Sequence, residues 1–204
     1  MTRVAALFVD PKGPYPTLLG AENCWDEARD ARTYAGPCPV VAHPPCGRWC
    51  RLAKFVESRH PSMKVGDDGG CFSSALHKVR YHLGVLEHPA WSLAWGAHEL
   101  PIPPSSGWQQ SLENSMEWTC EVWQSAYGHP ASKATWLFYK GYAAPAPMLW
   151  SHTRGSKVVA HCTKRGDGTI WRRNADRMHS GTHLTPPAFA RALIELARNC
   201  GGAP

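Results

Sequence analysis

The chain has 204 residues, of which 43% are hydrophobic, which is enough for one domain with a substantial core. No apolar run approaches the ~18 residues of a membrane-spanning helix, and the N-terminal stretch lacks the long apolar region of a signal peptide. We therefore expect a cytoplasmic protein without a membrane partner. The net charge of +6 favours an anionic partner, and eight scattered cysteines favour reduced thiols or a metal site over a disulfide framework.

The first half of the chain alternates short apolar runs with amphipathic or charged segments. Residues 4–9, 39–43 and 85–86 predict buried strands, each ending in a polar residue or a proline. Residues 21–35 predict a charged helix, and residues 72–79 carry apolar side chains at helical spacing. This alternation favours an α/β sheet with flanking helices.

The second half has fewer clear periods. A loop is expected over 101–115, followed by strands over 117–127 and 134–140. Residues 141–183 form a basic, loop-rich insertion, and 185–198 predict a closing amphipathic helix. We expect residues 1–204 to make a single α/β domain.

The segment Pro39–Cys50 presents a cysteine at the end of a strand. Pro44 and Pro45 stop that strand because neither can donate a ladder hydrogen bond. Cys46 is thereby lifted off the sheet, beside basic and aromatic groups, as a reactive cysteine would be. The alternative is an inert cysteine packed under a loop.

Glu87 repeats this pattern, because it ends an apolar run just before Pro89. Open α/β sheets bind ligands at the carboxyl ends of their strands. If the two strands are neighbours, Cys46 and Glu87 face one pocket. A thiolate and a carboxyl group so placed suit addition to an electron-poor ring.

Four motifs resemble those of compact phage-type DNA cytosine-5 methyltransferases. Pro44-Pro45-Cys46 and Leu86-Glu87-His88-Pro89 resemble the catalytic cysteine and glutamate motifs. The segments 127–137 and 184–193 resemble the Tyr-Gly segment and the closing Pro-Pro helix of the phage-type members. The four occur in the family's order.

The resemblance implies a Rossmann-like methyltransferase-type sheet, reduced in its N-terminal half, acting on DNA in the host-cell cytoplasm. Cys46 would be the nucleophile on cytosine carbon 6, and Glu87 would hold the ring nitrogen. Lys133 or Arg48 would steady the base or its phosphate.

The cofactor half departs from the family. S-adenosylmethionine is bound there by a Phe-x-Gly-x-Gly turn and by an acidic residue after the second strand, whereas residues 7–13 read Leu-Phe-Val-Asp-Pro-Lys-Gly. The stretch before Cys46 is too short for two further βα units, and His88 replaces the usual asparagine. An abbreviated cofactor pocket would use Asp10, Asp26, Asp68 and Pro44. The alternative is a derivative that kept the base-handling half and lost methyl transfer.

A basic stretch lies before the last helix. It predicts a phosphate-contacting surface made by Arg154, Lys157, Lys164, Arg165, Arg172 and Arg173. A solvated charged loop would have the same composition.

Other interpretations remain open. His43, Cys46 and Cys50 could be zinc ligands, but their spacing is not standard, so we expect no metal. A zinc nucleobase deaminase would need a His-x-Glu motif that the chain lacks. The chain could also be a non-catalytic accessory protein that binds nucleic acid or protein.

Overall fold

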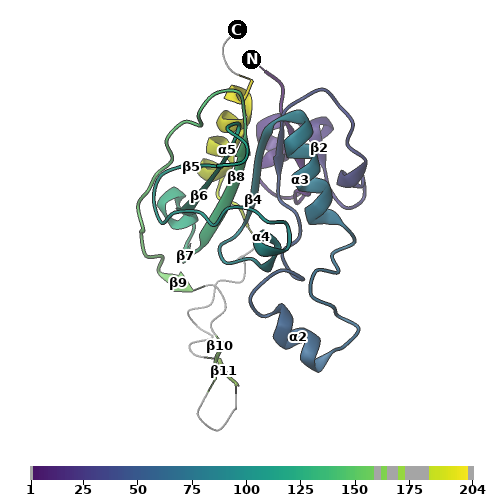
Figure 1. Ribbon diagram of the computed structural model, residues 1–204, viewed down its shortest axis with the longest axis vertical. Coiled ribbons are helices and arrows are strands. Elements are labelled where there is room, and N and C mark those ends of the chain that lie inside the picture. Colours follow the sequence, from purple (N-terminus) through teal and green to yellow (C-terminus); the bar gives the residue numbers. More distant parts are fainter. Residues whose placement is uncertain (1, 159–161, 165–169, 173–183, 202–204) are drawn as a thin grey trace.

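The structure is a computed structural model that describes residues 2–158, 162–164, 170–172 and 184–201. Its centre is a seven-stranded mixed sheet with the order β2-β1-β3-β4-β8-β6-β5 (Figure 1). The strands are β1 (Ala5–Leu7), β2 (Cys24–Trp25), β3 (Val40–Ala42), β4 (Gly84–Pro89), β5 (Gln109–Gln110), β6 (Glu117–Trp123) and β8 (Ala134–Lys140). With helices on both faces, this confirms the α/β class.

Strand direction divides the sheet into two parts. Strands β2, β1, β3 and β4 are parallel, so their carboxyl ends meet at one edge. Strand β8 is antiparallel to both β4 and β6, and β5 is antiparallel to β6. The edge where the four parallel strands end is called the carboxyl edge below.

Helices cover the two faces of the sheet. Helices α1 (Tyr15–Leu19) and α5 (Pro187–Asn199) pack on one face, and α3 (Cys71–His82) and α4 (Leu93–Ala97) pack on the other. Helix α2 (Ala53–Arg59) lies away from both faces. Within the part of the chain that the structure describes, no helix is long and apolar enough to cross a membrane.

Alternation along the strands assigns each residue to a face. Val41 and Val85 pack on one face with Phe189 of α5. Val40 and Leu86, one position away in each strand, pack on the other face with α3. These strands are therefore buried on both sides, which is why they read as continuous apolar runs.

Gly84 allows β4 to lie close to β3. Its φ is +124°, and a Cβ there would meet the Val40 carbonyl oxygen at 2.0 Å. Any side chain would force the two strands apart, so this position needs glycine.

Smaller elements lie beyond the carboxyl edge. Strand β7 (Ala131–Ser132) pairs with β9 (Lys157–Val158), and β10 (Cys162–Lys164) pairs with β11 (Ile170–Arg172). In Figure 1, α2 and the β10–β11 hairpin both project from the same end of the molecule.

The predicted helix over 21–35 is wrong. This segment contains two short 3-10 turns, η1 (Ala21–Asn23) and η2 (Ala31–Thr33), with β2 between them. Asp26 Oδ1 accepts the Arg29 backbone N–H at 2.8 Å, and the Arg29 guanidinium donates to the carbonyls of Glu22 and Cys24. Such local bonds compete with the helix. A two-residue strand therefore fits before β3, flanked by 3-10 turns and with no α-helix between β2 and β3.

Other predictions hold more closely. The helix over 72–79, the strand over 134–140 and the closing helix are confirmed as α3, β8 and α5. The strand predicted over 117–127 ends at Trp123, and its last four residues form the 3-10 turn η3 (Gln124–Tyr127). The loop over 101–115 includes the two residues of β5.

Candidate active site

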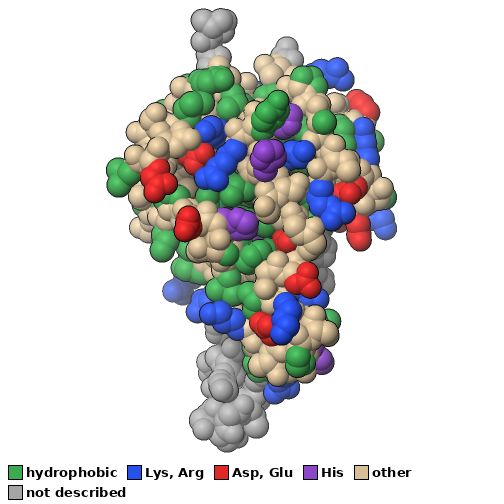
Figure 2. All heavy atoms as spheres, turned by 45° about the vertical axis from the view of Figure 1, so that its right-hand side comes forward, with side chains coloured by type: hydrophobic (Ala, Val, Ile, Leu, Met, Phe, Trp, Pro, Cys, Tyr) green, Lys and Arg blue, Asp and Glu red, His purple; other side chains and the backbone are tan. Residues whose placement is uncertain are grey.

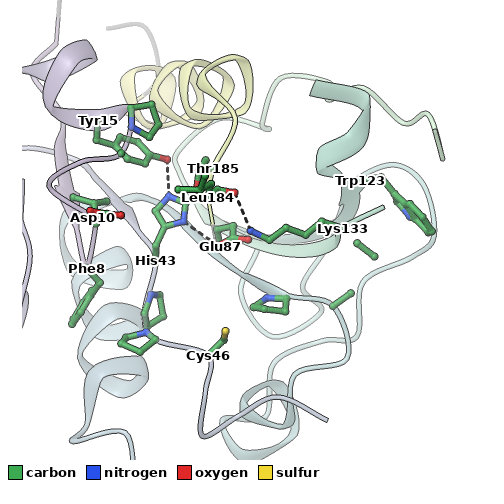
Figure 3. Close-up of a pocket in the computed structure, with 18 of the residues that line it drawn as sticks. Phe8, Asp10, Tyr15, His43, Cys46, Glu87, Trp123, Lys133, Leu184 and Thr185 are labelled. Carbon is green, nitrogen blue, oxygen red and sulfur yellow. Dashed lines mark hydrogen bonds and ion pairs between the residues drawn. The ribbon is translucent and has the colours of Figure 1, made fainter. Parts of the chain in front are cut away.

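A cavity of about 710 Å³ opens at the carboxyl edge, where β1, β3 and β4 end (Figure 3). Strands β1 and β3 are neighbours, but the chain leaves β1 towards β2 and leaves β3 towards β4, on opposite sides. The loops diverge above this pair, where open α/β sheets bind their ligands. The polar side chains of the lining are Asp10, Tyr15, His43, Cys46, Arg51, Glu87, Ser132, Lys133 and Thr185.

The turn after β3 places Cys46 on the cavity wall. The strand ends at Ala42, before the two prolines, as expected. The Cys46 carbonyl accepts the backbone N–H groups of Trp49 at 3.0 Å and of Cys50 at 2.9 Å. The Trp49 indole donates to Asp68 at 2.8 Å, which anchors the far side of the turn.

A row of hydrogen bonds crosses the cavity wall from α1 to β4. The Tyr15 hydroxyl lies 2.6 Å from His43 Nε2, and His43 Nδ1 lies 2.9 Å from Glu87 Oε2. Because an ionised carboxylate only accepts, Nδ1 carries a proton, and in the neutral ring Nε2 accepts from Tyr15. The row fixes the Glu87 side chain.

The second oxygen of Glu87 is also held. Gln124, fully buried in η3, donates from Nε2 to Glu87 Oε1 at 2.9 Å and to Thr135 at 3.0 Å. Lys133, the residue just before β8, reaches the same wall, and its Nζ lies 3.5 Å from the Leu184 carbonyl oxygen. In Figure 3 this ammonium points towards Leu184, beside Glu87.

These partners keep Glu87 ionised. Burial by itself raises the pKa of this carboxyl group, but the His43 hydrogen bond and the positive charge of Lys133 outweigh it, and the net pKa falls to about 2. The carboxylate is therefore a charged acceptor at neutral pH.

The thiol of Cys46 is a weaker acid than usual. The residue is exposed at the cavity, yet its thiol is crowded enough for desolvation to raise its pKa, and the Glu87 charge raises it further. Lys133 acts in the opposite direction. In the free protein Cys46 is thus mostly a neutral thiol.

The structure brings together five of the predicted residues. Cys46, Glu87, Lys133, Asp10 and Pro44 all line the cavity.

Arg48 and Asp68 are not among the lining residues. The Arg48 carbonyl accepts from Gly66 at 3.0 Å. Asp68 accepts the Phe72 backbone N–H at 2.8 Å, which ties it to the start of α3.

Asp26 lies at a second, smaller cavity of about 440 Å³. It directly follows β2, and Arg29 lines the same cavity, with its guanidinium 3.7 Å from the Trp25 ring centre. Val9 lines both cavities, so the two are adjacent at the carboxyl edge.

The residues after β1 do not form the S-adenosylmethionine site that the resemblance implies. Asp26 follows β2, where the resemblance implies an acidic residue. Asp10, however, stands where the glycine turn would begin, and its Oδ1 and carbonyl oxygen bind the N–H groups of Lys12 and Gly13 at 2.8 and 2.9 Å. That turn is closed on itself and offers no glycine cradle.

The side chains of His43, Cys46 and Cys50, considered above as zinc ligands, do not point to a common site. His43 uses both ring nitrogens on Tyr15 and Glu87, and the Cys50 thiol points to the Gly47 carbonyl at 3.5 Å. Among the described residues, no group of three or more His, Cys, Asp or Glu side chains is placed to hold a metal.

Only part of the basic stretch is described. Arg154 is exposed, and the backbones of Lys157, Lys164 and Arg172 lie in β9, β10 and β11. Arg165 and Arg173 lie outside the described residues.

A second basic surface lies next to Cys46. Residues 48–64, called the basic lobe below, carry five basic side chains against the single acidic Glu57. Arg51, Lys54 and Arg59 are exposed, and Figure 2 shows Lys and Arg gathered at this end of the molecule. The net charge of residues 1–100 conceals this surface, because acidic residues elsewhere in that half offset its positive charge.

Sequence reasoning also missed Tyr15 and Gln124, which hold the ends of the hydrogen-bonded row. Phe8 and Trp91, which line the cavity, both have a φ of +59°. Left-handed backbone is uncommon for such large residues and gathers at functional sites. No sequence signal marks any of these four.

Comparisons of the chain with protein-family models, with curated proteins and with solved structures found no match.

Proposed function

We propose that this chain is a nucleic-acid-modifying enzyme of the Rossmann-like, methyltransferase-like type, whose Cys46 adds to carbon 6 of a pyrimidine ring. The observation that carries the proposal is that Cys46 and Glu87 line one cavity from the ends of the neighbouring parallel strands β3 and β4. The sequence resemblance implies that the ring is cytosine and that the nucleic acid is DNA.

The topology supports this scaffold. The parallel order β2-β1-β3-β4 begins a doubly wound arrangement, and the cavity lies at its switch point. The N-terminal half is abbreviated, with α1 only five residues long.

The cavity can receive an extruded base. It is larger than a single pyrimidine ring, and Trp91 and Trp123 line it beside the polar row. Enzymes that act on a base take it out of the stack and hold it between aromatic or apolar side chains. Stacking on such rings contributes roughly 1–3 kcal/mol per base.

The chemistry uses groups already in place. Cys46 first gives its thiol proton to water, and the thiolate then forms the S–C6 bond while the C5–C6 π electrons move to the atom bonded to C4. The Lys133 ammonium can donate a hydrogen bond to that atom. Carbon 5 takes a proton from water, and reversal of these steps restores the ring with one C5 hydrogen exchanged.

The surroundings suit a polyanion. Arg51 joins the cavity wall to the basic lobe, and Arg154 lies exposed before β9. Phosphate contacts supply most of the sequence-independent affinity for nucleic acid.

A test needs no cofactor. A single-stranded oligonucleotide containing pyrimidines is incubated with the protein in heavy water, and loss of the C5 hydrogen is followed by mass spectrometry and NMR. We expect exchange by the native protein and none by Cys46→Ser. Cys50→Ser, four residues along the chain and outside the cavity lining, is the matched control and should exchange normally.

Two outcomes would contradict the proposal. Equal exchange by Cys46→Ser would show that Cys46 is not the nucleophile. Oligonucleotide binding without exchange on any pyrimidine would instead support a non-catalytic binding protein.

The group donor is a separate question. Calorimetric titration with S-adenosylmethionine tests it, and Asp26→Asn should weaken any binding. Absence of heat would argue against methyl transfer, while the exchange assay would still test Cys46.

A further inference from the structure

The inference concerns which pyrimidine the cavity accepts, and it rests on the proposed function. Uracil and cytosine rings differ at two positions that a protein can read. Uracil presents an N3–H donor between two carbonyl acceptors, whereas cytosine presents an N3 acceptor with an amino group on C4. The hydrogen-bond character of the cavity wall therefore discriminates between them.

Glu87 is held as an acceptor. It accepts from His43 Nδ1 at 2.9 Å and from Gln124 Nε2 at 2.9 Å, and these bonds join it to both sides of the wall. Each carboxylate oxygen can accept two hydrogen bonds, so each retains one free direction. To donate a proton to a ligand, Glu87 would first have to become neutral, which would weaken the bond from His43.

Ring geometry decides which ligand atom meets this acceptor. Figure 3 shows the Cys46 thiol on one side of the cavity and the row Tyr15–His43–Glu87 on the other. Carbon 6, which Cys46 attacks, lies directly opposite N3 in a pyrimidine ring. The group across the cavity from Cys46 is therefore the one that meets N3.

Turning cytosine so that its C4 amino group faces Glu87 is incompatible with attack of Cys46 on carbon 6. If its C4 amino group faced Glu87, the atom opposite would be N1, which carries the sugar. Cys46 would then lie at N1 rather than at carbon 6. An acceptor at Glu87 thus repels the N3 lone pair of a cytosine that is in position to react.

Lys133 adds a second criterion. Its ammonium lies on the same wall as Glu87 and can only donate. In uracil, both substituents next to N3 are carbonyl oxygens, so Lys133 meets an acceptor whichever way the ring faces. Polarising the C4 oxygen also draws electrons from the C5–C6 bond and favours thiolate addition.

From these contacts we infer that the cavity selects a uracil-type ring, with a protonated N3 between two carbonyl groups, over cytosine. A ring with a different substituent on carbon 5 keeps this hydrogen-bonding edge. The selectivity is set by Glu87, held by His43 and Gln124, together with Lys133.

The experiment compares C5 hydrogen exchange on two oligonucleotides that differ only in one uracil or one cytosine. We expect exchange at uracil to be at least about tenfold faster, because a site built to pair a donor rejects an analogue that lacks it. Parallel reactions with the free nucleotides dUMP and dCMP show whether the ring comes from a polymer or from a nucleotide.

Glu87→Gln is the decisive variant, because its amide can donate to the N3 of cytosine. The uracil-to-cytosine ratio should fall to about one or below. A ratio is insensitive to the fraction of folded protein, so partial unfolding of the variant does not confound it. The matched control is Glu121→Gln, a carboxylate on β6, which β8 separates from β4. Glu121 accepts from the indoles of Trp123 and Trp136 instead, and the variant should keep the native ratio.

Failure of the inference differs from failure of the proposed function. Exchange at cytosine as fast as at uracil, or a ratio unchanged by Glu87→Gln, overturns the selectivity and leaves Cys46 as the nucleophile. No exchange at either ring overturns both.

Discussion

His43 Nδ1 lies 2.9 Å from Glu87 Oε2, and this contact joins the turn after β3 to the end of β4. Both side chains are almost buried, at 11% and 9% exposure, so solvent screens the contact little. It is the central link in the hydrogen-bonded row that shapes the cavity.

Replacing His43 with Leu should therefore lower the free energy of unfolding by about 3 kcal/mol at neutral pH, because it leaves a buried charge without its partner. The pKa of Glu87 is depressed to about 2, below its ordinary 4.5. Its stabilising contribution is thus complete above pH 4.5 and is lost as the pH falls towards 2.

Urea unfolding at several pH values measures this difference. It should be largest above pH 4.5 and shrink below it. Tyr15→Phe, which removes only the hydroxyl group at the other end of the row, should cost about 1 kcal/mol and keep the pH dependence. A His43→Leu difference that is independent of pH would contradict the assignment.

His88 should make the protein sensitive to mild acid. Burial lowers its pKa from 6.5 to about 4, so the folded state resists a proton that the unfolded chain accepts. Stability should fall by about 3 kcal/mol as the pH drops from 6.5 to 4. His88→Phe, which keeps a ring against Phe72 and Trp95, should flatten this part of the profile. The same slope in both proteins would show that other groups cause it.

Alkylation of Cys46 should respond to its two charged neighbours in opposite directions. Glu87 raises the pKa of the thiol and Lys133 lowers it. Glu87→Gln should therefore shift the alkylation profile to lower pH, and Lys133→Met should shift it to higher pH. Mass spectrometry of the Cys46 peptide separates this thiol from the others. If the alkylation profiles of both variants shifted in the same direction, the two charges would not be acting on Cys46 as described.

Gly84→Ala should be among the most destabilising single substitutions in the sheet. The new Cβ would meet the Val40 carbonyl oxygen at 2.0 Å, with φ at +124°. A loss above about 3 kcal/mol is expected from the clash and the strained backbone. Gly96→Ala in α4 has no heavy atom within 4 Å of the added Cβ, and it should be neutral or slightly stabilising in the same denaturation assay.

The basic lobe should account for part of the salt dependence of oligonucleotide binding. Exchanging both Arg51 and Lys54 for Gln should weaken binding to all sequences similarly, and reduce the slope of log affinity against log salt by about 0.7 for each lost phosphate contact. Arg191→Gln, an exposed charge on α5, should leave the slope unchanged. Titrations at three or more salt concentrations give these slopes, and a slope unaltered by the double variant would place the nucleic acid elsewhere.

Local sequence patterns predicted much of the fold where one residue type decides the backbone. Pro44 and Pro45 end β3 because they cannot donate to a ladder, and the apolar spacing of α3 and α5 reflects burial on one face. The segment 21–35 was misassigned because the side chains of Asp26 and Arg29 bind nearby backbone groups. These short bonds outweigh helix propensity, and no periodicity records them.

The sequence by itself indicated that Cys46 follows a strand and that Glu87 lies near the carboxyl end of another, since prolines and apolar runs act within a few residues. Only the tertiary structure decided what surrounds them. Tyr15 reaches His43 across 28 positions, and Gln124 reaches Glu87 across 37. Those contacts depend on strand order, which places β3 between β1 and β4 and returns β8 beside β4. Chain closure over such distances is a property of the whole sheet, and it made Glu87 a fixed acceptor facing the thiol of Cys46.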